Sequence, residues 1–460
     1  MSQSQFSYSR LLFLVGSLAV LGACASVDQD KAFSDFKQSL GERVSQDLVW
    51  RRGGEADGAV DARISELLAK PLTLDGAVQA ALLNNRDLQA RYAELGIAQA
   101  DLVAAGLLSN PVFELMVRPT TNPSEFANLE FALAQNILDL FQRPARLRVA
   151  EAAYAGTQSA VAQGVIATIN EVRHAYVEAV GARNALSVKA EVETAAAASS
   201  QLAQRFHEAG NISDLELAEE REAYEDAALE SIALDLEAKE ATETLAALLN
   251  VAPAQLTIAG NLPEPPKSDP PAEGLEAIAL ERRFDMIAAR KAIDAALADL
   301  KLKTDWRLWK DVELTLSAER EGDKQWAIGP SIALALPLFD QGQPEVAQAA
   351  AAALKAENEA RALEAEIRRD VRTAAHRVTA ARKMIERYRT SALPLKQDIA
   401  RLKQEEYNFM LIGVFEVLVA RREQSEAFHG YVETVRDYWL ARADLANATG
   451  GGPLSTGETP

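Results

Sequence analysis

Residues 312–317 read VELTLS, and residues 326–336 read WAIGPSIALAL. In both stretches apolar residues occupy every second position, and the residues between them are polar or small. This period of two predicts a pair of β-strands, each with one apolar and one polar face, joined by a turn at Gly322-Asp323. Pro330 falls on the apolar face of the second strand and weakens it as a central strand, because proline cannot donate to a sheet.

A second pair of strands is predicted earlier, at residues 112–117 and 128–133, on either side of a turn through Pro119 and Asn122-Pro123. Soluble sandwiches also show such alternation. Three features favour strands that cross a membrane. The strands approach the roughly 9–11 residues that tilted membrane strands need. Their polar face is small and hydrophilic, and Trp306, Trp309 and Trp326 lie at strand ends like an interfacial girdle.

Four strands are too few to enclose a pore, because the smallest barrels need about eight. A sheet with open edges is also excluded from lipid, where every backbone N–H and C=O must be paired. If these strands cross a bilayer, several copies of the chain must therefore contribute to one barrel. After the N-terminal region, the sequence has no run of ~18 consecutive apolar residues that would form a membrane-spanning helix.

The two strand pairs belong to an internal duplication. Identical residues recur 200 positions apart: Val112 and Val312, Pro144 and Pro344, Glu216 and Glu416, and Arg221 and Arg421. We expect a first repeat at residues 73–261 and a second at 274–449, each built as helix, two strands, long helix, turn and long helix. Residues 262–273 form a proline-rich linker that cannot be helical. Residues 24–72 form an N-terminal extension, and residues 450–460 a flexible tail.

Helices are predicted to fill the rest of each repeat. Thr73 is the expected N-cap of an opening helix that runs to about Leu108, where Asn110-Pro111 breaks it. From Ala145 to about His207 only two glycines interrupt the helical pattern, which gives roughly 90–100 Å of helix. Apolar residues recur there at steps of three and four, as they do in the second repeat, and this predicts coiled-coil-like packing. The residues concerned are Val165, Ile169, Val172, Tyr176 and Val180, then Leu363, Ile367, Val371, Ala374 and Val378, and on the returning helix Phe428, Val432, Val435 and Trp439.

The turns between the long helices carry the most specific motif. The first reads HEAGNISDLEL at residues 207–217, and the second reads YNFMLIGVFEVL at residues 407–418. These turns resemble the periplasmic hairpin tips of TolC-like outer-membrane efflux proteins: Tyr, Gly three later, Ser or Thr three after that, then an acidic residue and Val-Leu. The resemblance covers nearly the whole mature chain, including the repeat, Gly329-Pro330-Ser331 and the segment 337–340.

The resemblance implies a mainly α-helical protein with membrane β-strands. Three chains would form a homotrimer whose 12-stranded β-barrel, with four strands from each chain, continues into a long α-helical coiled-coil barrel. Proteins of this family catalyse no reaction and are passive exit ducts. Their tips dock onto a periplasmic adaptor (a membrane fusion protein) that is bound to an inner-membrane pump of the RND type. This sequence departs from the family at Met410, where Gly is usual, at Gly413, where Ser or Thr is usual, and at Val419, where a second acid is usual.

The resemblance also implies roles for individual tip residues. We expect adaptor-docking or hinge positions at Gly210, Ile212, Ser213 and Leu215 in the first tip, and at Gly413, Val414, Phe415 and Leu418 in the second. The alternative is that these residues only cap a helical hairpin, with glycine supplying the left-handed turn. Glu416 is expected to form a cation-attracting ring at the aperture, although an ordinary surface carboxylate would look the same in the sequence.

The N-terminus predicts secretion and a lipid anchor. Residues 1–23 contain Arg10 and an apolar run that is too short to span a bilayer, as in a signal peptide. Leu21-Gly22-Ala23-Cys24 resembles a bacterial lipobox, and Cys24 is the chain's only cysteine. Acylation of Cys24 would anchor the mature protein in the outer membrane, with the remainder extending into the periplasm.

Composition and motifs exclude other classes of function. The net charge of -19 argues against nucleic acid as a partner. No catalytic constellation, phosphate loop or set of metal-binding histidines is apparent, so no cofactor or structural metal is expected. The rival hypotheses are a lipid-anchored periplasmic coiled-coil adaptor or scaffold, and a lipid-anchored hydrolase or sugar-binding protein. The second tip, from Tyr407 to Gly413, resembles those of family members that act with heavy-metal export pumps, and this resemblance favours divalent metal or copper-group ions over drugs as cargo.

Overall fold

A computed structural model describes residues 27–54, 56–119, 121, 126–258, 260–269, 271, 273–309, 312–320 and 325–452. The predicted signal peptide, Cys24 and both strand-joining turns lie outside these residues, apart from the edges of the turns. The chain divides into two units. Unit 1 holds the residues up to Asp35 together with Leu95–Thr157 and Arg290–Glu357, and unit 2 holds Phe36–Glu94, Gln158–Ala289 and the residues from Asn358 onward.

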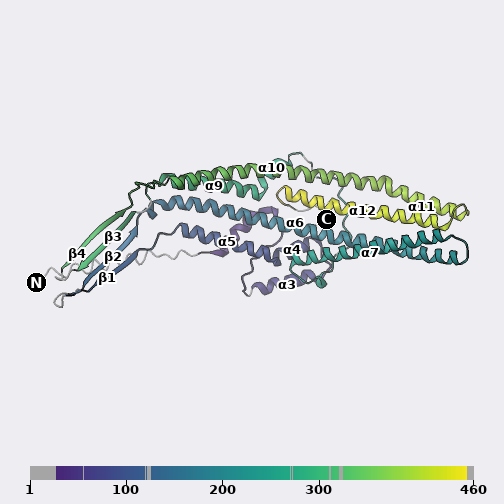
Figure 1. The fold of residues 1–460 in the computed structure, drawn as a ribbon, viewed down its shortest axis with the longest axis horizontal. Coiled ribbons are helices and arrows are strands. Elements are labelled where there is room, and N and C mark those ends of the chain that lie inside the picture. The colour runs from purple at the N-terminus through teal and green to yellow at the C-terminus, as the bar shows by residue number, and fades with distance from the viewer. Residues whose placement is uncertain are drawn as a thin grey trace. The chain divides into compact units, whose positions relative to one another are not determined.

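Unit 1 contains one antiparallel four-stranded sheet in the order β1-β2-β3-β4 (Figure 1). The strands are β1 (Val112–Arg118), β2 (Asn128–Asn136), β3 (Val312–Arg320) and β4 (Trp326–Leu334). All four were predicted. The strand β1 has seven residues and the others nine, so they are at or below the short end of the expected length. Pro330 lies in β4, which is an edge strand of this sheet, where proline is tolerated.

The register confirms that the sheet has two different faces, because residues paired across antiparallel strands point to the same side. Leu115 pairs with Phe131, and Leu133 pairs with Leu316. Leu316 in turn pairs with Pro330. The apolar face holds Phe113, Leu115, Val117, Leu129, Phe131, Leu133, Leu314, Leu316, Trp326, Ile328 and Ile332. The opposite, polar face holds Glu114, Glu130, Ala132, Glu313, Thr315, Ser317, Glu319, Gly329 and Ser331.

The opening helix of the first repeat is two helices, which corrects the prediction of one helix to Leu108. Thr73 is its N-cap as predicted, and the Gly76 N–H donates to its hydroxyl. Helix α4 (Leu74–Asn84) ends at Asn85, and α5 (Arg86–Ala105) begins immediately after it. The Asn85 carbonyl oxygen Oδ1 accepts from the Leu88 N–H, while its amide donates to the Leu248 carbonyl. A long-range contact thus fixes the break. The second repeat opens in the same way with α8 (Leu275–Arg282) and α9 (Phe284–Asp305).

The long helices form hairpins in each repeat. In the first, α6 (Leu138–Glu208) has 71 residues and is followed by α7 (Asp214–Leu249). In the second, α10 (Gln343–Arg387), a π-helical segment (Tyr388–Ala392) and α11 (Leu393–Asn408) lead to α12 (Val414–Ala448). The predicted apolar stripe of α6 is buried throughout. In the second repeat, Leu363 and Val432 are half-buried. Phe428 is exposed, at 45%, and its ring centroid lies 6.1 Å from that of Tyr431.

The remaining described segments of unit 2 pack onto this helical core. The N-terminal helices are α2 (Gln29–Leu40), which begins in unit 1, and α3 (Ala56–Leu68), with a short 3₁₀ turn (Gly41–Arg43) between them. Phe36 and Leu40 are buried, and the Phe36 ring lies 6.0 Å from that of Tyr92. The described linker residues contain neither helix nor strand. None of the described helices is long and apolar enough to span a membrane.

Candidate functional site

The polar face of the sheet carries an excess of negative charge. Glu114, Glu130, Glu313 and Glu319 share this face with one cation, Arg118. Arg118 Nη2 lies 2.8 Å from Glu130 Oε2, and Glu130 and Glu319 are direct cross-strand partners. Among the described residues, the other three carboxylates on this face form no ion pair with a cation. A surface of this sign attracts cations and repels anions.

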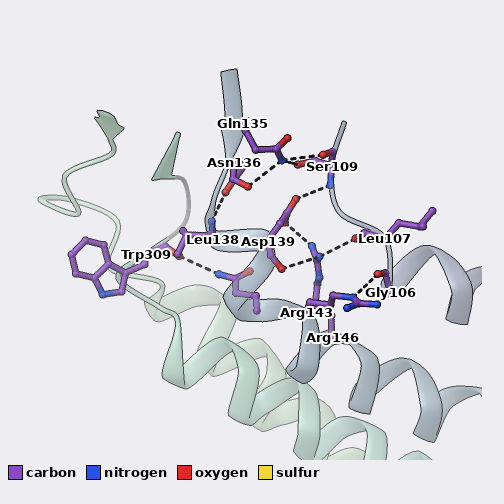
Figure 2. Close-up of polar contacts among 11 residues, drawn as sticks. Gly106, Leu107, Ser109, Gln135, Asn136, Leu138, Asp139, Arg143, Arg146 and Trp309 are labelled. Atoms are coloured by element: carbon purple, nitrogen blue, oxygen red, sulfur yellow. Dashed lines mark hydrogen bonds and ion pairs between the residues drawn. The ribbon is translucent and has the colours of Figure 1, made fainter. Parts of the chain in front are cut away.

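A polar cluster fixes the junction where the strands of the first repeat meet its helices (Figure 2). The Ser109 N–H donates to Asp139 Oδ2 at 3.1 Å, and Gln135 Nε2 donates to the Ser109 carbonyl at 3.0 Å. The Leu138 N–H donates to Asn136 Oδ1 at 2.9 Å, which begins α6 seven residues before the predicted start at Ala145. The segments entering β1 and leaving β2 are thus tied together at the helical end of the sheet.

Two arginines complete this junction. Arg146 Nη1 donates to Asp139 Oδ1 at 2.7 Å, and Arg143 Nε donates to the Gly106 carbonyl at 2.7 Å. Hydrogen bonds from Ser109, opposed by partial burial and helped by Arg146, lower the pKa of Asp139. The carboxylate therefore stays charged, and the junction can hold the strands in a fixed direction relative to the helix ends of unit 1.

Exposed apolar side chains surround the same end of the sheet. Each of the four places where a strand meets a helix contributes some of them, either in the connecting segment or in the first turn of α6. The residues Leu107, Leu108, Leu140, Phe141, Leu308, Trp309, Leu336, Leu338 and Phe339 are 37–97% exposed. At the turn end of the sheet Trp326 is 51% exposed, and it stacks on Phe131 at 6.0 Å. The apolar face thus continues to both ends of the strands, which is the arrangement of a protein surface that contacts lipid.

The first hairpin tip follows the rules for a stable helix–turn–helix. Gly210 adopts φ +73°, the left-handed conformation that ends α6. Ser213 is the N-cap of α7 and forms a capping box with Glu216: the hydroxyl accepts from the Glu216 N–H, and Glu216 Oε2 accepts from the Ser213 N–H at 2.8 Å. These hydrogen bonds lower the pKa of Glu216.

The second tip has the same backbone but different side chains. Met410 adopts φ +57°, although a side chain makes this conformation unfavourable. Gly413 is the N-cap of α12 and offers no side-chain oxygen. Its dihedral angles, φ −79° and ψ 163°, match those of Ser213, −81° and 166°. Glu416 therefore has no serine to bond and lies 3.1 Å from Lys403 Nζ instead.

The predicted tip residues differ in exposure. Gly210, Ser213, Leu215, Gly413 and Glu416 are exposed, while Ile212, Val414, Phe415 and Leu418 are half-buried. The Phe415 ring packs edge-on against Phe206 at 6.0 Å, so Phe415 contributes to the contact between the two hairpins. The most exposed apolar side chains at either tip were missed: Phe409, Met410 and Leu411 are 77%, 93% and 73% exposed. Three apolar residues in a tight turn were the available signal, because turns normally carry polar residues.

Metal ligands do not gather in the described part of the chain: no three His, Cys, Asp or Glu side chains there lie close enough to hold an ion. His174 and His207 each have one carboxylate neighbour, Asp444 at 2.8 Å and Asp214 at 2.7 Å. The features that distinguish this structure are thus surfaces, namely the two faces of the sheet and the two tips.

Comparison with known proteins identifies the class. A model of the outer membrane efflux protein family matches residues 77–251 and again residues 276–451, so that both repeats carry the family's pattern. The chain belongs to the outer membrane efflux protein family. The cobalt-zinc-cadmium resistance protein CzcC of Cupriavidus metallidurans is 26% identical over 349 residues, which cover 75% of this chain and 80% of that protein.

Solved structures confirm the fold of this outer membrane efflux protein. The outer-membrane channel OprN superposes with a TM-score of 0.69 at 20% identity, over 90% of this chain and 96% of that one. The open state of the MtrE outer membrane channel of Neisseria gonorrhoeae gives 0.66 at 18% identity, over 91% and 98%. The predicted family, its fold and the function of an outer-membrane efflux channel are confirmed, and the family is one of transport proteins rather than enzymes.

Proposed function

We propose that three copies of this chain close a 12-stranded barrel in the outer membrane and form the exit duct of a tripartite efflux pump. The observation that carries the proposal is the sheet itself. It has an apolar face, a polar face, and two edges, β1 and β4, with no further strand among the described residues. Lipid does not tolerate open edges, so β4 of one chain pairs with β1 of the next. Two chains would give eight strands and a barrel filled by side chains, whereas twelve leave a lumen.

Cysteine cross-linking tests this closure. One cysteine replaces Glu114 on β1, and a second replaces in turn each polar-face residue of β4, namely Ala327, Gly329, Ser331 and Ala333. We expect at least one pair to give disulfide-linked dimers and trimers in membranes. The matched control places the first cysteine at Ala132, which pairs with Glu114 but lies on the interior strand β2, and should give none. If none of the four pairs cross-links in correctly folded protein, the proposed closure is wrong.

The second tip is proposed as the principal docking surface for the periplasmic adaptor, which is itself bound to an RND-type inner-membrane pump. Phe409, Met410 and Leu411 form its apex and are 73–93% exposed, and an apolar patch of this kind marks an interaction site. The predicted positions Gly413 and Val414 adjoin this apex, while Gly210, Ile212, Ser213 and Leu215 provide the corresponding surface of the first tip. Phe415 and Leu418 are half-buried and are proposed as hinge or packing positions.

Charge substitutions compare the two tips directly. Phe409→Asp is expected to lower cargo export by tenfold or more, because an adaptor would have to bury the new charge. Leu215→Asp in the first tip, at a residue that is 67% exposed, is the matched control and should lower export less. The measurement is resistance to the exported compound in cells whose membranes contain equal amounts of trimer. Equal resistance of Phe409→Asp and wild type would overturn the assignment of the apex.

Glu416 is proposed as the aperture acid that attracts cations at the tip. Its support is its exposure at the start of α12 and its departure from a capping role. Lys403 at 3.1 Å partly neutralises it. Replacing Glu416 by Gln should reduce the cation selectivity of the channel in a planar bilayer. The Glu216→Gln variant, in which the equivalent acid of the first tip is changed, should alter selectivity less.

The cargo is proposed to be divalent heavy-metal or copper-group ions. Two observations support it: the relative named for cobalt, zinc and cadmium resistance, and the excess of carboxylates on the polar face that would line the barrel. A strain that lacks the protein should become sensitive to cobalt, zinc, cadmium or copper. Sensitivity only to dyes and antibiotics would show that the cargo is organic, and the duct itself would remain.

Acylated Cys24 is proposed to anchor the mature N-terminus in the outer membrane. The support is the lipobox-like sequence before it and its place at the end of a secretion signal. Replacing Cys24 by Ala should abolish incorporation of labelled palmitate. Labelling that persists in the variant would rule out this site.

A further inference from the structure

Arg320 stands out as a cation on the apolar face of the sheet. It is the last residue of β3, where its cross-strand partners are Leu129 on β2 and Trp326 on β4. These partners place it on the same side as Phe131, Leu316 and Ile328. Because β3 is an interior strand, closure of a barrel at β1 and β4 would leave this surface uncovered.

Two aromatic rings lie next to the guanidinium group of Arg320. Its carbon Cζ lies 6.0 Å from the centroid of the Phe126 ring and 6.0 Å from that of Trp326. Both rings are about half exposed, at 51%. Contacts of this kind orient the planar group and leave the N–H donors of Nη1 and Nη2 for a ligand. Arg320 Nε is buried and has no hydrogen-bond partner in the described part of the chain.

Arg118 provides an internal contrast. It ends β1 at the same turn end of the sheet, but its cross-strand partner Asn128 lies on the polar face. There, Arg118 Nη2 meets the Glu130 carboxylate at 2.8 Å. The described residues supply no such carboxylate to Arg320. Among the described residues, Arg118 is thus paired with a carboxylate on the polar face, and Arg320 lies on the apolar face without one.

We infer that Arg320, with Trp326 and Phe126, binds a phosphate group of the phosphorylated glycolipid in the outer leaflet. The inference rests on the proposed function, in which the apolar face contacts lipid and the helices continue into the periplasm. Within unit 1 the helices join the sheet at one end, so the turn end, where Arg320 lies, faces outward. A charge on the lipid face is costly at the bilayer centre and tolerated near the interface, where lipid phosphates lie. Arginine matches phosphate with two parallel N–H donors.

The test measures binding of lipid A to the purified, detergent-solubilised full-length protein by native mass spectrometry. Wild type should retain lipid A with two phosphates, and dephosphorylated lipid A should bind at least tenfold more weakly. Arg320→Gln should weaken binding of phosphorylated lipid A by about tenfold, the value of one charged hydrogen bond. Arg320→Lys keeps the charge but lacks the fork and should show a smaller loss of about threefold. Arg118→Gln is the matched control and should bind like wild type.

Three results would overturn the inference. The first is equal binding of phosphorylated lipid A by wild type and both Arg320 variants. The second is equal weakening by Arg118→Gln. The third is displacement of lipid A by millimolar inorganic phosphate, which would identify a site for free phosphate instead. Should Arg320→Gln fail to assemble, Arg320→Lys alone decides the outcome. A wild-type protein that is monomeric and does not conduct would instead contradict the proposed function, so the two failures are distinguishable.

Discussion

The two hairpin tips share one backbone but follow different chemical rules. In both, the turn closes with the same two hydrogen bonds: Gly210 N–H to the His207 carbonyl and Asn211 N–H to the Phe206 carbonyl in the first tip, Met410 N–H to the Tyr407 carbonyl and Leu411 N–H to the Glu406 carbonyl in the second. The first tip puts glycine at the left-handed position and serine at the N-cap, where each is favoured. The second puts methionine and glycine there.

This difference indicates where function has displaced stability. A left-handed methionine and an N-cap without a side chain each cost the second tip free energy, yet both are retained alongside an exposed apolar apex. Violations of local rules concentrate at functional sites. The first tip is therefore interpreted as a scaffold, and the second as the element that meets a partner.

In the second repeat, a cluster of hydrogen bonds around Asp269 joins the linker to the helices, and the first repeat has no equivalent among its described residues. Asp269 of the linker accepts hydrogen bonds from Arg382, from Tyr438 at 2.7 Å and from Arg442 at 3.0 Å. The Trp439 indole N–H donates to the Pro263 carbonyl at 2.7 Å. The residues 200 positions earlier than Arg382, Tyr438 and Arg442 are Ala182, Ala238 and Thr242, which cannot form this cluster. The linker, whose described residues contain neither helix nor strand, thus bonds to α10 and α12 of the second hairpin.

Removing the Asp269 cluster should have the largest effect on stability. Asp269→Ala leaves Arg442, whose side chain is 6% exposed, and Arg382 without their counter-charge. We expect a loss of about 3 kcal/mol in the free energy of unfolding, the usual cost of breaking a buried ion pair. Chemical denaturation of the purified protein measures it. Asp235→Ala, which removes an exposed pair with Lys239, is the control and should cost less than about 1 kcal/mol.

The same cluster predicts a pH dependence. Burial opposes ionisation of Asp269, but hydrogen bonds from Arg382 and Tyr438 outweigh it and lower the pKa of Asp269. A carboxyl with a depressed folded pKa contributes stability that is complete above the ordinary Asp pKa of about 3.9 and is lost as the pH falls through the folded value. In denaturation curves recorded from neutral pH to pH 3, the difference in unfolding free energy between wild type and Asp269→Asn should thus stay constant down to about pH 4 and shrink below it. Curves that stay equally separated across this range would contradict the assignment.

Exchanging the residues at the left-handed positions of the two tips should have the next largest effect on stability. Met410→Gly removes the side chain from a positive-φ position and should stabilise the second tip by about 1 kcal/mol. Gly210→Met should destabilise the first tip by a similar amount. Hydrogen exchange of the tip amides reports each local change. Slower exchange in Met410→Gly would show that the methionine strains the second tip, and unchanged exchange would contradict it.

Exchanging the N-caps should give the smallest effect. Ser213→Ala opens the capping box and should cost the first tip about 1 kcal/mol. Gly413→Ser restores a cap hydroxyl beside Glu416 and should stabilise the second tip by a few tenths of a kcal/mol. Unchanged amide exchange in α12 of Gly413→Ser would mean that Glu416 keeps its ion pair with Lys403 and does not form a capping box with the new serine.

Local patterns predicted the elements of this protein, and long-range contacts explain the errors. The period of two at residues 312–317 and the N-cap at Thr73 depend on neighbours in sequence, and both were correct. The break at Asn85 depends on the Leu248 carbonyl, and the exposure of Phe428 on how the hairpins pack, so neither could be predicted locally. The candidate residues at the tips came from family resemblance. The exposed apex at Phe409 to Leu411 was not predicted, because the family motif specifies residue types at the tip and not how far each side chain is exposed.

The central claim is that one chain cannot seal a pore and that three chains do so together. Native mass spectrometry of the detergent-extracted protein, followed by reconstitution of the same sample in a planar bilayer, tests it most directly. We expect a complex of three chains with a stable, cation-favouring conductance. A single chain that leaves the bilayer insulating would contradict it.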